Sequence, residues 1–399
     1  MSASPEPYEI GIGEEQVNDL RERLARTRWP QQPPGGWALG ADLAAVRELC
    51  AHWADGYDFG RLERLNELGS CIVEGVHLLH LPASGAEPAG HPLVLLHGWP
   101  SGPIEYEAAA RSISAAGHEV IVPSLPGYAW SPAPSRPLNV AGVAALLEAA
   151  VEALLGATVP EGGERRTGED YVVAGGDWGA MIAARMAFDQ PGKVAGLHVT
   201  TPHTLPVPGD LSHPPLSEAE AAWIERGRRW RRRRGYHLAV QSQAPDAISA
   251  GLTDSPAGLA AYLLPKYRGW SESGGDLERR FSEDELCDFL TMYWATGSIA
   301  SSMRLYWAEG GSRWRLGAEE RIAAPAGAAI YPGDMAGEWG DAGEEGTAPG
   351  LNPPREWSER LLPGLRRWTE MESGGHFAAF EEPEGYAAEL LAFCSQIQA

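Results

Sequence analysis

The 399-residue sequence predicts an α/β protein with a doubly wound, mostly parallel sheet, a helical insertion and an N-terminal wrapping segment. Three observations lead to this fold class. Short runs of apolar and β-branched residues alternate with longer helix-like runs over much of the chain. One strand-like run ends in glycines, presents Asp177 and passes at once into a helix-like run at 180–187. Polar side chains also follow two later predicted strands, at the carboxyl ends where open α/β proteins place their active sites.

Residues 1–90 are predicted to form a separate N-terminal segment. A polar amphipathic helix is expected at 14–26, because apolar residues recur there at helical spacing. Prolines and glycines then break this helix, a second helix is expected at 42–53, and the stretch 72–81 alternates like a pair of strands. Three tryptophans indicate that the segment wraps over an apolar surface: Trp29, Trp37 and Trp53.

Residues 91–202 are predicted to carry the first part of the core sheet. The run 92–97 is continuously apolar, which is typical of a central parallel strand buried on both faces. Strands and helices then alternate at the lengths expected of a doubly wound sheet. The further elements expected here are a helix at 104–116, a strand at 119–123, a helix at 139–155 capped by Asn139, the strand and helix around Asp177, and a strand at 194–200.

Residues 203–318 interrupt this alternation. They are rich in Arg, Trp, Tyr and helix-like runs, so we expect a helical cap inserted between two strands of the sheet. A basic cluster at 226–234 is interpreted as a solvated helix face that pairs with nearby carboxylates, and not as a nucleic-acid site. The second part of the core is expected in 319–399. Its predicted elements are strands at 326–332 and 365–370, a surface loop at 338–350 and a last helix at 383–397.

Composition and charge limit the kinds of partner. The net charge of −22 and the pI near 4.9 argue against general nucleic-acid binding. The four cysteines are widely spaced, with no CxxC pair, so reduced thiols are expected rather than disulfides or a zinc site. The first residues lack the features of a signal peptide, and no long apolar run indicates a membrane span. We therefore expect a cytoplasmic protein with no membrane association, no metal and no cofactor.

The run 175–179 has the pattern G-x-D-x-G, where serine hydrolases carry G-x-S-x-G in a nucleophile elbow. An aspartate is already an anion at neutral pH, so Asp177 needs no base to attack carbon. Such an attack makes an ester and requires a substrate with an electrophilic sp3 carbon, such as an epoxide or an alkyl halide. The structural alternative is a helix N-terminus that Asp177 caps.

Two more polar residues, Asp334 and His376, follow predicted strands. The chain order Asp177, Asp334, His376 is the order of nucleophile, acid and histidine in the α/β-hydrolase fold. His376 can deprotonate a water, and Asp334 would orient the ring and stabilise the imidazolium. Hydrolysis of the ester passes through an oxyanion. The backbone N–H groups of Trp178 and Trp99 are expected to stabilise that oxyanion.

Several motifs make the sequence similar to one family. They are His97-Gly98-Trp99-Pro100, Gly175-Gly176-Asp177-Trp178-Gly179, Gly374-Gly375-His376-Phe377 with its continuation to Pro383, and the turn Leu125-Pro126-Gly127-Tyr128. These motifs resemble those of the microsomal-type epoxide hydrolases. The resemblance covers nearly the whole chain, and it is to the soluble members that lack the family's membrane anchor.

The resemblance implies that Asp177 is the nucleophile, His376 the base and Asp334 the orienting acid. Tyr331-Pro332-Gly333-Asp334 occupies the place where family members have an aromatic residue, Pro, any residue and then Glu or Asp. The loop after Asp334 is longer and more acidic than usual, so Glu338 and Asp341 stay open as alternatives for the acid.

The resemblance also implies two cap tyrosines, Tyr236 and Tyr306, that hold and protonate the epoxide oxygen. Tyrosine suits this role because a phenol with a pKa near 10 stays protonated at neutral pH and donates readily. Tyr262 and Tyr293 are secondary candidates.

The implied activity is that of an epoxide hydrolase, which converts an oxirane and water into a vicinal diol through an alkyl-enzyme ester. The alternatives are a haloalkane dehalogenase, which would have Asn in place of Trp99, and a non-catalytic ligand-binding relative. The many aromatic residues of the cap favour a bulky or aryl epoxide, used in secondary metabolism of the enediyne type or in detoxification. The expected partners are the epoxide and water, and a homodimer is left open.

Overall fold

The structure is a computed structural model that describes residues 4–85, 88–157, 170–212, 214–311, 314–336 and 350–398. Over this part of the chain, one nine-stranded sheet has the strand order β1-β2-β3-β5-β4-β6-β7-β8-β9. β1, β2 and β3 pair in antiparallel fashion, and every pair from β5 to β9 is parallel, so the predicted mostly parallel sheet is confirmed. The strands are β1 (Glu6–Pro7), β2 (Ser70–Val73), β3 (Val76–Leu81), β4 (Leu93–Leu96), β5 (Val120–Pro123), β6 (Tyr171–Gly175), β7 (Val194–Val199), β8 (Ala326–Ile330) and β9 (Leu365–Glu370).

Two fully buried strands, β4 and β6, lie next to each other at the centre of the sheet. Every residue of both strands is buried, because helices cover the two faces. Leu93 lies opposite Val172 and Leu96 lies opposite Gly175, so the two parallel strands end at the same edge. The residues that follow them, His97 and Gly176, therefore begin two neighbouring loops at the carboxyl edge of the sheet.

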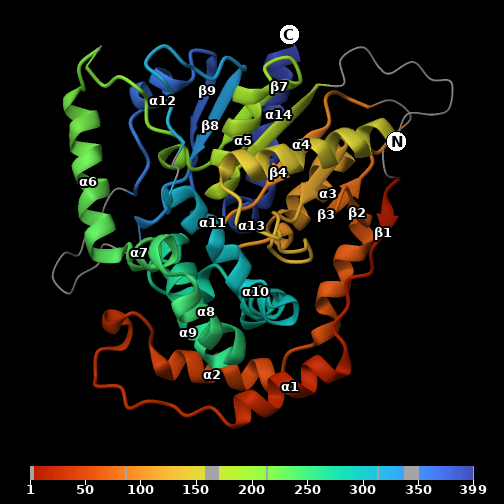
Figure 1. Cartoon of the computed structure of the whole chain (residues 1–399), viewed down its shortest axis with the longest axis vertical. Helices are drawn as coiled ribbons and strands as arrows, with labels where there is room; N and C mark the ends of the chain where they lie inside the picture. Colours follow the sequence, from red (N-terminus) through yellow and green to blue (C-terminus); the bar gives the residue numbers. More distant parts are fainter. Residues whose placement is uncertain are drawn as a thin grey trace.

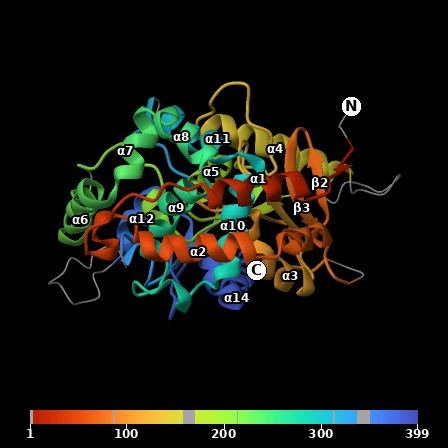
Figure 2. The same ribbon diagram turned by 90° about the horizontal axis from the view of Figure 1, so that it is seen from below.

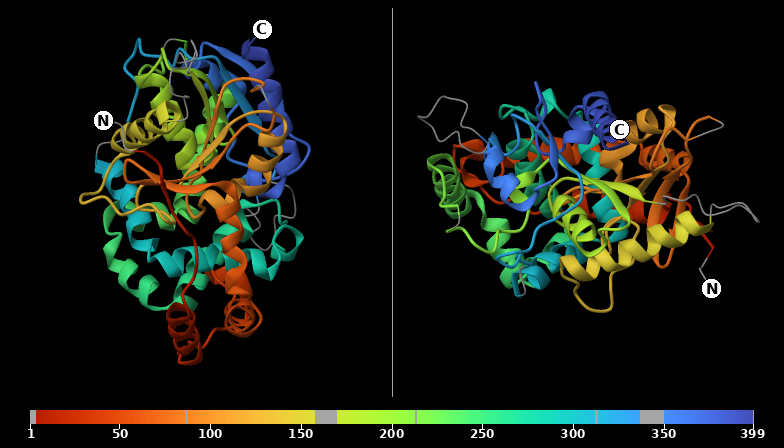
Figure 3. Two further views of the ribbon diagram at one scale, coloured as in Figure 1. Left: turned by 90° about the vertical axis from the view of Figure 1, so that its right-hand side faces the viewer. Right: turned by 90° about the horizontal axis from the view of Figure 1, so that it is seen from above.

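Helices cover both faces of the sheet. α4 and α5 pack against each other on one face, and α3 and α14 pack against each other on the other face (Figures 1 and 3). The Asn139 side chain accepts a hydrogen bond from the Gly142 N–H at 3.0 Å, as expected of an N-cap. The helices of the sheet layers are α3 (Glu107–Ala115), α4 (Val140–Ala157), α5 (Trp178–Asp189), α12 (Arg355–Leu361), α13 (Ala378–Glu381) and α14 (Pro383–Gln398), with 3-10 turns at η3 (Pro103–Tyr106) and η4 (Pro202–Thr204).

A group of helices between β7 and β8 forms the cap, which lies below the sheet in the view of Figure 1. The helical character predicted for this stretch is confirmed for its described residues, where the one β-type pairing is an isolated bridge between Val207 and Arg315. α7 and α11 make the most extensive helix pair of the cap. The cap helices are α6 (Glu218–Arg234), α7 (Tyr236–Gln243), α8 (Asp246–Asp254), α9 (Pro256–Trp270), α10 (Glu283–Thr296) and α11 (Ile299–Gly311), with a 3-10 turn η5 (Leu277–Arg279).

The N-terminal helices α1 (Glu14–Ala25) and α2 (Leu43–Asp55) run along the cap helices α9 and α10 (Figures 1 and 2). Trp53 of α2 is fully buried there, and its indole N–H donates a hydrogen bond to the Thr291 hydroxyl at 2.8 Å. The N-terminal segment therefore packs over the cap helices at this contact, in the manner expected from its tryptophans. The boundary at residue 90 stays a prediction, since β2 and β3 carry the N-terminal segment into the core sheet.

A second contact between the N-terminal segment and the cap is ionic. Asp288 of α10 has only 1% of its side chain exposed. It accepts hydrogen bonds from the Tyr57 hydroxyl at 2.6 Å and from the guanidinium groups of Arg61 and Arg64 at 3.1 and 3.0 Å. Arg61 and Arg64 belong to the 3-10 stretch η2 (Phe59–Leu68), which leads directly into β2. A buried carboxylate thus joins the cap to a segment that continues into the sheet.

Helix α4 is the one described helix with the length and hydropathy of a membrane span, with a mean hydropathy of 1.8. It packs against α5 and contacts β2 and β3, so its apolar residues serve the core of the fold. The core helix of a soluble protein passes the same test of length and composition. The expectation that no segment spans a membrane stays a prediction.

The basic cluster lies on α6, which extends along one side of the molecule in Figure 1. Arg228 and Arg232 lie 3.6 and 3.4 Å from the carboxylate of Glu225 on the same helix. Arg226 instead turns inward and donates hydrogen bonds to the Gly350 and Asn352 carbonyl oxygens. The contacts of Arg228 and Arg232 agree with the interpretation of the cluster as a solvated helix face that pairs with carboxylates, whereas those of Arg226 differ from it.

Candidate active site

Asp177 occupies a sharp turn between β6 and α5. Its backbone has φ 51° and ψ −126°, a conformation that an L-residue with a side chain rarely adopts. The turn is tight because α5 starts directly beneath β4, where a Cβ on Gly179 would overlap the Leu96 carbonyl oxygen. The Asp177 N–H donates a hydrogen bond to the Thr201 hydroxyl at 2.6 Å, which ties the turn to the end of β7. This is the geometry of a nucleophile elbow.

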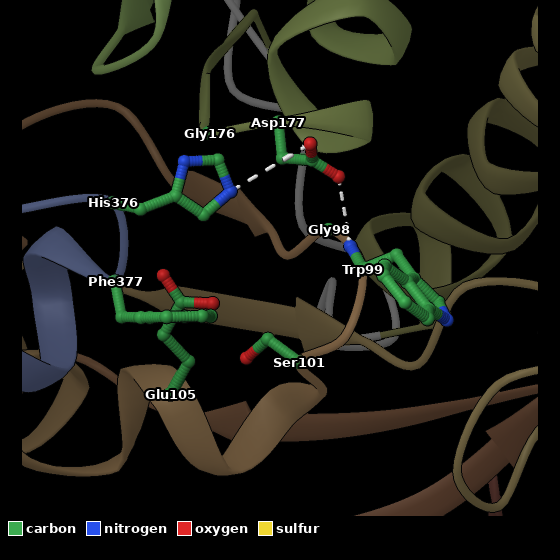
Figure 4. Close-up of a pocket in the computed structure, with 8 residues that line it drawn as sticks. All are labelled: Gly98, Trp99, Ser101, Glu105, Gly176, Asp177, His376 and Phe377. Carbon is green, nitrogen blue, oxygen red and sulfur yellow. Dashed lines mark hydrogen bonds and ion pairs between the residues drawn. The ribbon is translucent and has the colours of Figure 1, made fainter. Parts of the chain in front are cut away.

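The two carboxylate oxygens of Asp177 have different neighbours (Figure 4). Oδ1 accepts a hydrogen bond from the Trp99 backbone N–H at 2.8 Å. Oδ2 lies 3.6 Å from Nε2 of His376. The loop after β4 can approach this closely because Gly98 has no side chain, and a Cβ there would overlap the Asp177 side chain. One oxygen is therefore held by a backbone donor and the other faces the imidazole.

His376 is placed by a turn between β9 and α13. Its backbone N–H donates to the Trp270 carbonyl oxygen at 3.0 Å. The next N–H, of Phe377, donates to the Glu381 carboxylate at 3.1 Å, and this carboxylate also accepts from the Glu272 N–H at 2.8 Å. The turn is thus fixed both to the cap helix α9 and to α13. Only 2% of the His376 side chain is exposed.

The other ring nitrogen of His376, Nδ1, makes a 2.9 Å hydrogen bond with Oδ1 of Asp334. Asp334 lies just after β8 and is completely buried. Burial by itself raises the pKa of the Asp334 carboxyl, but the nearby His203 and His376 outweigh it and hold that pKa well below its usual range. Asp334 is therefore an anion that faces the imidazole.

The pKa of His376 also depends on burial and on neighbouring charges, which act in opposite directions. Burial of the ring lowers this pKa, but the hydrogen bonds and negative charges of Asp177 and Asp334 outweigh burial and raise it to about 10. With both carboxylates ionised, His376 is an imidazolium at neutral pH. Any event that neutralises Asp177 removes one of the two causes, so the pKa of His376 falls and the ring becomes a better base.

Sequence reasoning did not identify His203, although its Nδ1 lies 3.2 Å from Oδ2 of Asp334. His203 belongs to the turn η4, directly after β7, and 9% of its side chain is exposed. Its position after a predicted strand was an available signal, because polar residues at that edge of the sheet converge. The Asp334 carboxylate thus lies between two imidazoles.

The two predicted cap tyrosines lie in different surroundings. Tyr306 of α11 is buried, and its ring meets that of Trp178 edge to face at a centroid distance of 4.7 Å. Burial and the charge of Asp177 raise the pKa of the Tyr306 phenol well above its usual value, while the Trp178 indole N–H acts in the opposite direction. Tyr306 is therefore a protonated phenol near the elbow.

Tyr236 is 42% exposed, and its ring is edge to face with those of His237 and Tyr262 at centroid distances of 6.1 Å. The ammonium group of the buried Lys266 lies 3.9 Å from the centroid of the Tyr236 ring. The neighbour of Tyr236, His237, stacks on Trp99 at 5.7 Å with an interplanar angle of 9°. Tyr236 thus lies at the outer side of an aromatic cluster above Trp99, and Tyr306 lies at its inner side.

The secondary candidates, Tyr262 and Tyr293, are engaged in other contacts. The Tyr262 hydroxyl accepts a hydrogen bond from the Gln241 side chain at 3.2 Å. The Tyr293 hydroxyl donates to the Ser101 carbonyl oxygen at 3.0 Å and fixes the loop after β4. The alternative acids Glu338 and Asp341 lie outside the described residues. In the described part of the chain, no group of three His, Cys, Asp or Glu side chains is arranged to hold a metal ion.

A small pocket lies beside Asp177 and His376 (Figure 4). It continues past the Phe377 ring to the side chains of Ser101 and Glu105. Glu105 is buried and was not singled out from the sequence, because it lies within a turn, five residues beyond the HGWP motif, with no strand before it. The structure therefore brings together Asp177, His376, Asp334 and the backbone of Trp99, and places His203 and Glu105 beside them.

Comparisons with known proteins match nearly the whole chain to one group of enzymes. A family model described as the epoxide hydrolase N terminus matches residues 5–106, and one described as the alpha/beta hydrolase fold matches residues 91–247. The juvenile hormone epoxide hydrolase of Bombyx mori is 30% identical over 433 residues, which cover 98% of this chain and 86% of that protein. Epoxide hydrolase 1 of Sus scrofa is 28% identical over 441 residues, which cover 98% and 89%.

Solved structures show the same relationship. The crystal structure of the Bombyx mori juvenile hormone epoxide hydrolase has a TM-score of 0.77 and 28% identity, and the match covers 100% of this chain and 95% of that one. The Aspergillus niger epoxide hydrolase has a TM-score of 0.79, covering 99% and 97%, and at 21% identity it supports the fold alone. The chain is thus an epoxide hydrolase of the α/β-hydrolase fold and belongs to the microsomal-type epoxide hydrolase family.

Proposed function

We propose that this epoxide hydrolase opens its substrate through a covalent ester on Asp177. Oδ2 attacks one carbon of the oxirane, a C–O bond of the ring breaks, and the released alkoxide takes a proton from a phenol of the cap. The observation that carries this proposal is the asymmetry of the carboxylate. Its Oδ1 is held by the Trp99 N–H at 2.8 Å, which leaves Oδ2 as the attacking atom.

The ester is then hydrolysed by a water that His376 activates. When Oδ2 is bonded to carbon, Asp177 has lost its negative charge, and one cause of the raised pKa of His376 is gone. The ring can then take a proton from water, while Asp334 at 2.9 Å orients it and stabilises the imidazolium. The water oxygen attacks Cγ of Asp177, and negative charge develops on Oδ1.

The charge on Oδ1 requires preorganised donors. The Trp99 N–H already bonds this oxygen, and the N–H of Trp178, at the start of α5, is the second donor in the proposal. The tetrahedral intermediate collapses by cleavage of the bond between Cγ and the alkyl oxygen. His376 returns its proton to the departing alkoxide, and the product is a vicinal diol.

Tyr306 is the better supported of the two proton donors. It is buried beside Trp178, and its raised pKa keeps the phenol protonated over the whole neutral range. Tyr236 is assigned as the second donor on the strength of the family resemblance, and 42% of its surface is exposed. In this proposal Tyr306 contributes more to ring opening than Tyr236 does.

The substrate class follows from the side chains around the nucleophile. Trp99, Trp178 and Tyr306 surround Asp177 with aromatic surface, and Trp270 and His237 extend it toward the cap. Such a lining binds a bulky apolar or aryl epoxide by area and by ring stacking. We place the enzyme either in secondary metabolism or in detoxification, with a cytoplasmic location and no membrane association.

The test is to trap the ester. His376→Gln removes the base but leaves the nucleophile, so incubation with styrene oxide should add the mass of the epoxide to the peptide that contains Asp177. Asp177→Asn is the matched control and should show neither adduct nor diol. A His376→Gln protein that never carries an adduct would contradict the covalent mechanism. Release of halide from haloalkanes without diol formation from any epoxide would favour the dehalogenase alternative.

A further inference from the structure

Glu105 is a buried carboxyl group that the mechanism above does not use. It lies on η3, and only 7% of the residue is exposed. It lines the same pocket as Asp177, His376 and Phe377, which are drawn together in Figure 4. The pocket that it lines also contains Ser101, His376 and Asp177. A carboxylate, a hydroxyl and an imidazole thus share one small enclosed space with the nucleophile.

The turn that carries Glu105 is fixed by hydrogen bonds. The Glu105 N–H donates to the Gly102 carbonyl oxygen at 3.1 Å. The next residue, Tyr106, is buried, and its hydroxyl donates to the Leu96 carbonyl oxygen at the end of β4 at 3.0 Å. The same loop contains Trp99, whose N–H bonds Asp177. The position of Glu105 relative to the nucleophile is therefore set by the loop that also supplies the oxyanion donor.

The Glu105 carboxyl is poised between its two protonation states. Burial raises its pKa to about 7, while the polar side chain of Ser101 and the positive charge of His376 act in the opposite direction. The negative charges of Asp177 and Glu381 add to the rise. Esterification removes the negative charge of Asp177, and the return of His376 to its neutral form removes a positive charge, so the two changes act in opposite directions on the pKa of Glu105.

Hydrolysis of the ester places specific demands on the water molecule. Its oxygen must point a lone pair at Cγ of Asp177, and one hydrogen must point at Nε2 of His376. The second hydrogen needs an acceptor, because an unpaired O–H in a buried site costs free energy and leaves the water free to rotate. Among the side chains that line the pocket, Phe377 is apolar, and Ser101 offers a neutral hydroxyl that donates to the Gly102 carbonyl oxygen at 3.5 Å. The Glu105 carboxylate is the stronger acceptor, because an ionised carboxylate accepts only and carries a negative charge.

We propose that Glu105 binds the hydrolytic water and orients it between His376 and the ester carbonyl of Asp177. This inference rests on the covalent mechanism proposed above. One proton of the water passes to His376 and then to the departing alkoxide. The other stays on the water oxygen, hydrogen-bonded to Glu105, until the Asp177 carboxylate re-forms and releases it. That proton replaces the one that the cap phenol donated to the opened ring, so the overall reaction consumes one water and one epoxide.

The experiment separates ester formation from ester hydrolysis. Rapid mixing of enzyme with styrene oxide, acid quenching and intact-protein mass spectrometry follow the ester over a single turnover. In Glu105→Gln, ester formation should stay within about twofold of wild type, while ester hydrolysis should slow roughly 10- to 100-fold because water is less well oriented. The ester should then accumulate in the steady state. Glu105→Asp keeps a carboxylate and should recover part of the hydrolysis rate.

The matched control is Glu148→Gln. Glu148 is also buried, on α4, and burial raises its pKa too, but it bonds Gln190 away from the pocket. This variant should hydrolyse the ester at the wild-type rate. Equal losses in both steps for Glu105→Gln, or an unchanged hydrolysis rate, would overturn the inference. If Glu105→Gln does not fold, the rates of ester formation and ester hydrolysis measured in Glu105→Asp test the inference instead. An absence of ester even in His376→Gln would instead refute the covalent mechanism itself.

Discussion

Nδ1 of His376 lies 2.9 Å from Oδ1 of Asp334, a residue 42 positions earlier in the chain, and the Asp334 side chain is completely shielded from solvent. This pair directs the opposite ring nitrogen toward Asp177, since a ring held at Nδ1 presents Nε2 on the other side. The second carboxylate oxygen faces His203 at 3.2 Å. The Asp334 carboxylate therefore has one oxygen that faces His376 and one that faces His203.

The first prediction concerns the charge of Asp334. Asp334→Asn removes a negative charge that helps to raise the pKa of His376 to about 10, so that pKa should fall. The sign follows because a carboxylate favours the charged imidazolium and an amide does not. Ester hydrolysis requires the neutral ring, so its acid limb should move to lower pH in the variant. The plateau rate should nevertheless drop by roughly 100-fold or more, because the ring loses its orientation.

The measurement is the rate of ester hydrolysis as a function of pH, by rapid quenching in wild type and variant. Ester formation in the same samples is the internal control, because it depends on Asp177 and the phenols. An acid limb that moves to higher pH in Asp334→Asn would contradict the assignment of Asp334 as the partner of the base.

The second prediction concerns His203. His203→Phe removes the polar group that faces Oδ2 of the buried Asp334, so the carboxylate is less stabilised and its pKa should rise. Loss of this polar neighbour of a buried charged group should slow ester hydrolysis about tenfold. His203→Gln keeps a donor and should recover most of the rate. Single-turnover rates measure this directly. Equal rates in His203→Phe and wild type would show that His376 alone suffices to hold Asp334.

The third prediction compares the two cap phenols. Tyr306→Phe should slow ester formation roughly 10- to 100-fold, because the alkoxide loses its buried proton donor. Tyr236→Phe should have a smaller effect, since its ring lies at the outer side of the cluster. The buried Tyr171 of β6, changed to Phe, is the control and should leave the rate unchanged. Stopped-flow tryptophan fluorescence or rapid quenching gives these rates. A larger loss in Tyr236→Phe would make Tyr236 the principal donor.

The fourth prediction concerns stability. Asp288→Asn removes the buried carboxylate that accepts hydrogen bonds from Arg61, Arg64 and Tyr57. The free energy of unfolding should fall by about 2 kcal/mol, a figure below that of a fully buried pair because the arginines are partly hydrated. Urea unfolding monitored by fluorescence measures the change. Asp19→Asn, at an exposed pair with Arg23, is the control and should have no measurable effect. Equal effects of the two changes would contradict a special role for Asp288.

Much of the sheet could be predicted from the sequence because its central strands are continuous apolar runs. The runs that became β4 and β6 are buried on both faces, and the residues after them could be assigned to one edge. The same logic located Asp177, Asp334 and His376, since each follows a predicted strand. The local sequence pattern was sufficient to predict a buried strand from its continuous apolar run, and to predict a site residue from its position directly after such a strand.

Other features depend on contacts between distant segments and have no local signal. β1 is a two-residue strand, and it exists because Glu6 and Pro7 lie opposite Ile72 and Cys71 of β2. Glu105 reaches the pocket of Asp177 and His376 only through the path of the loop after β4. The sequence also could not separate the surroundings of Tyr236 and Tyr306, because both lie on cap helices whose packing determines which ring faces Asp177.

The buried Asp288 has a consequence for how reactants enter and leave. The cap is connected to the sheet at its two chain connections. It is also connected through η2, whose arginines form ion pairs with Asp288 of α10 and which continues into β2. The two chain connections and the contact with η2 together resist a rigid-body rotation of the cap relative to the sheet. If the cap stays in place through turnover, entry of the substrate and exit of the product depend on local rearrangement of side chains and short loops, and an ester at Asp177, as proposed above, is shielded from bulk solvent.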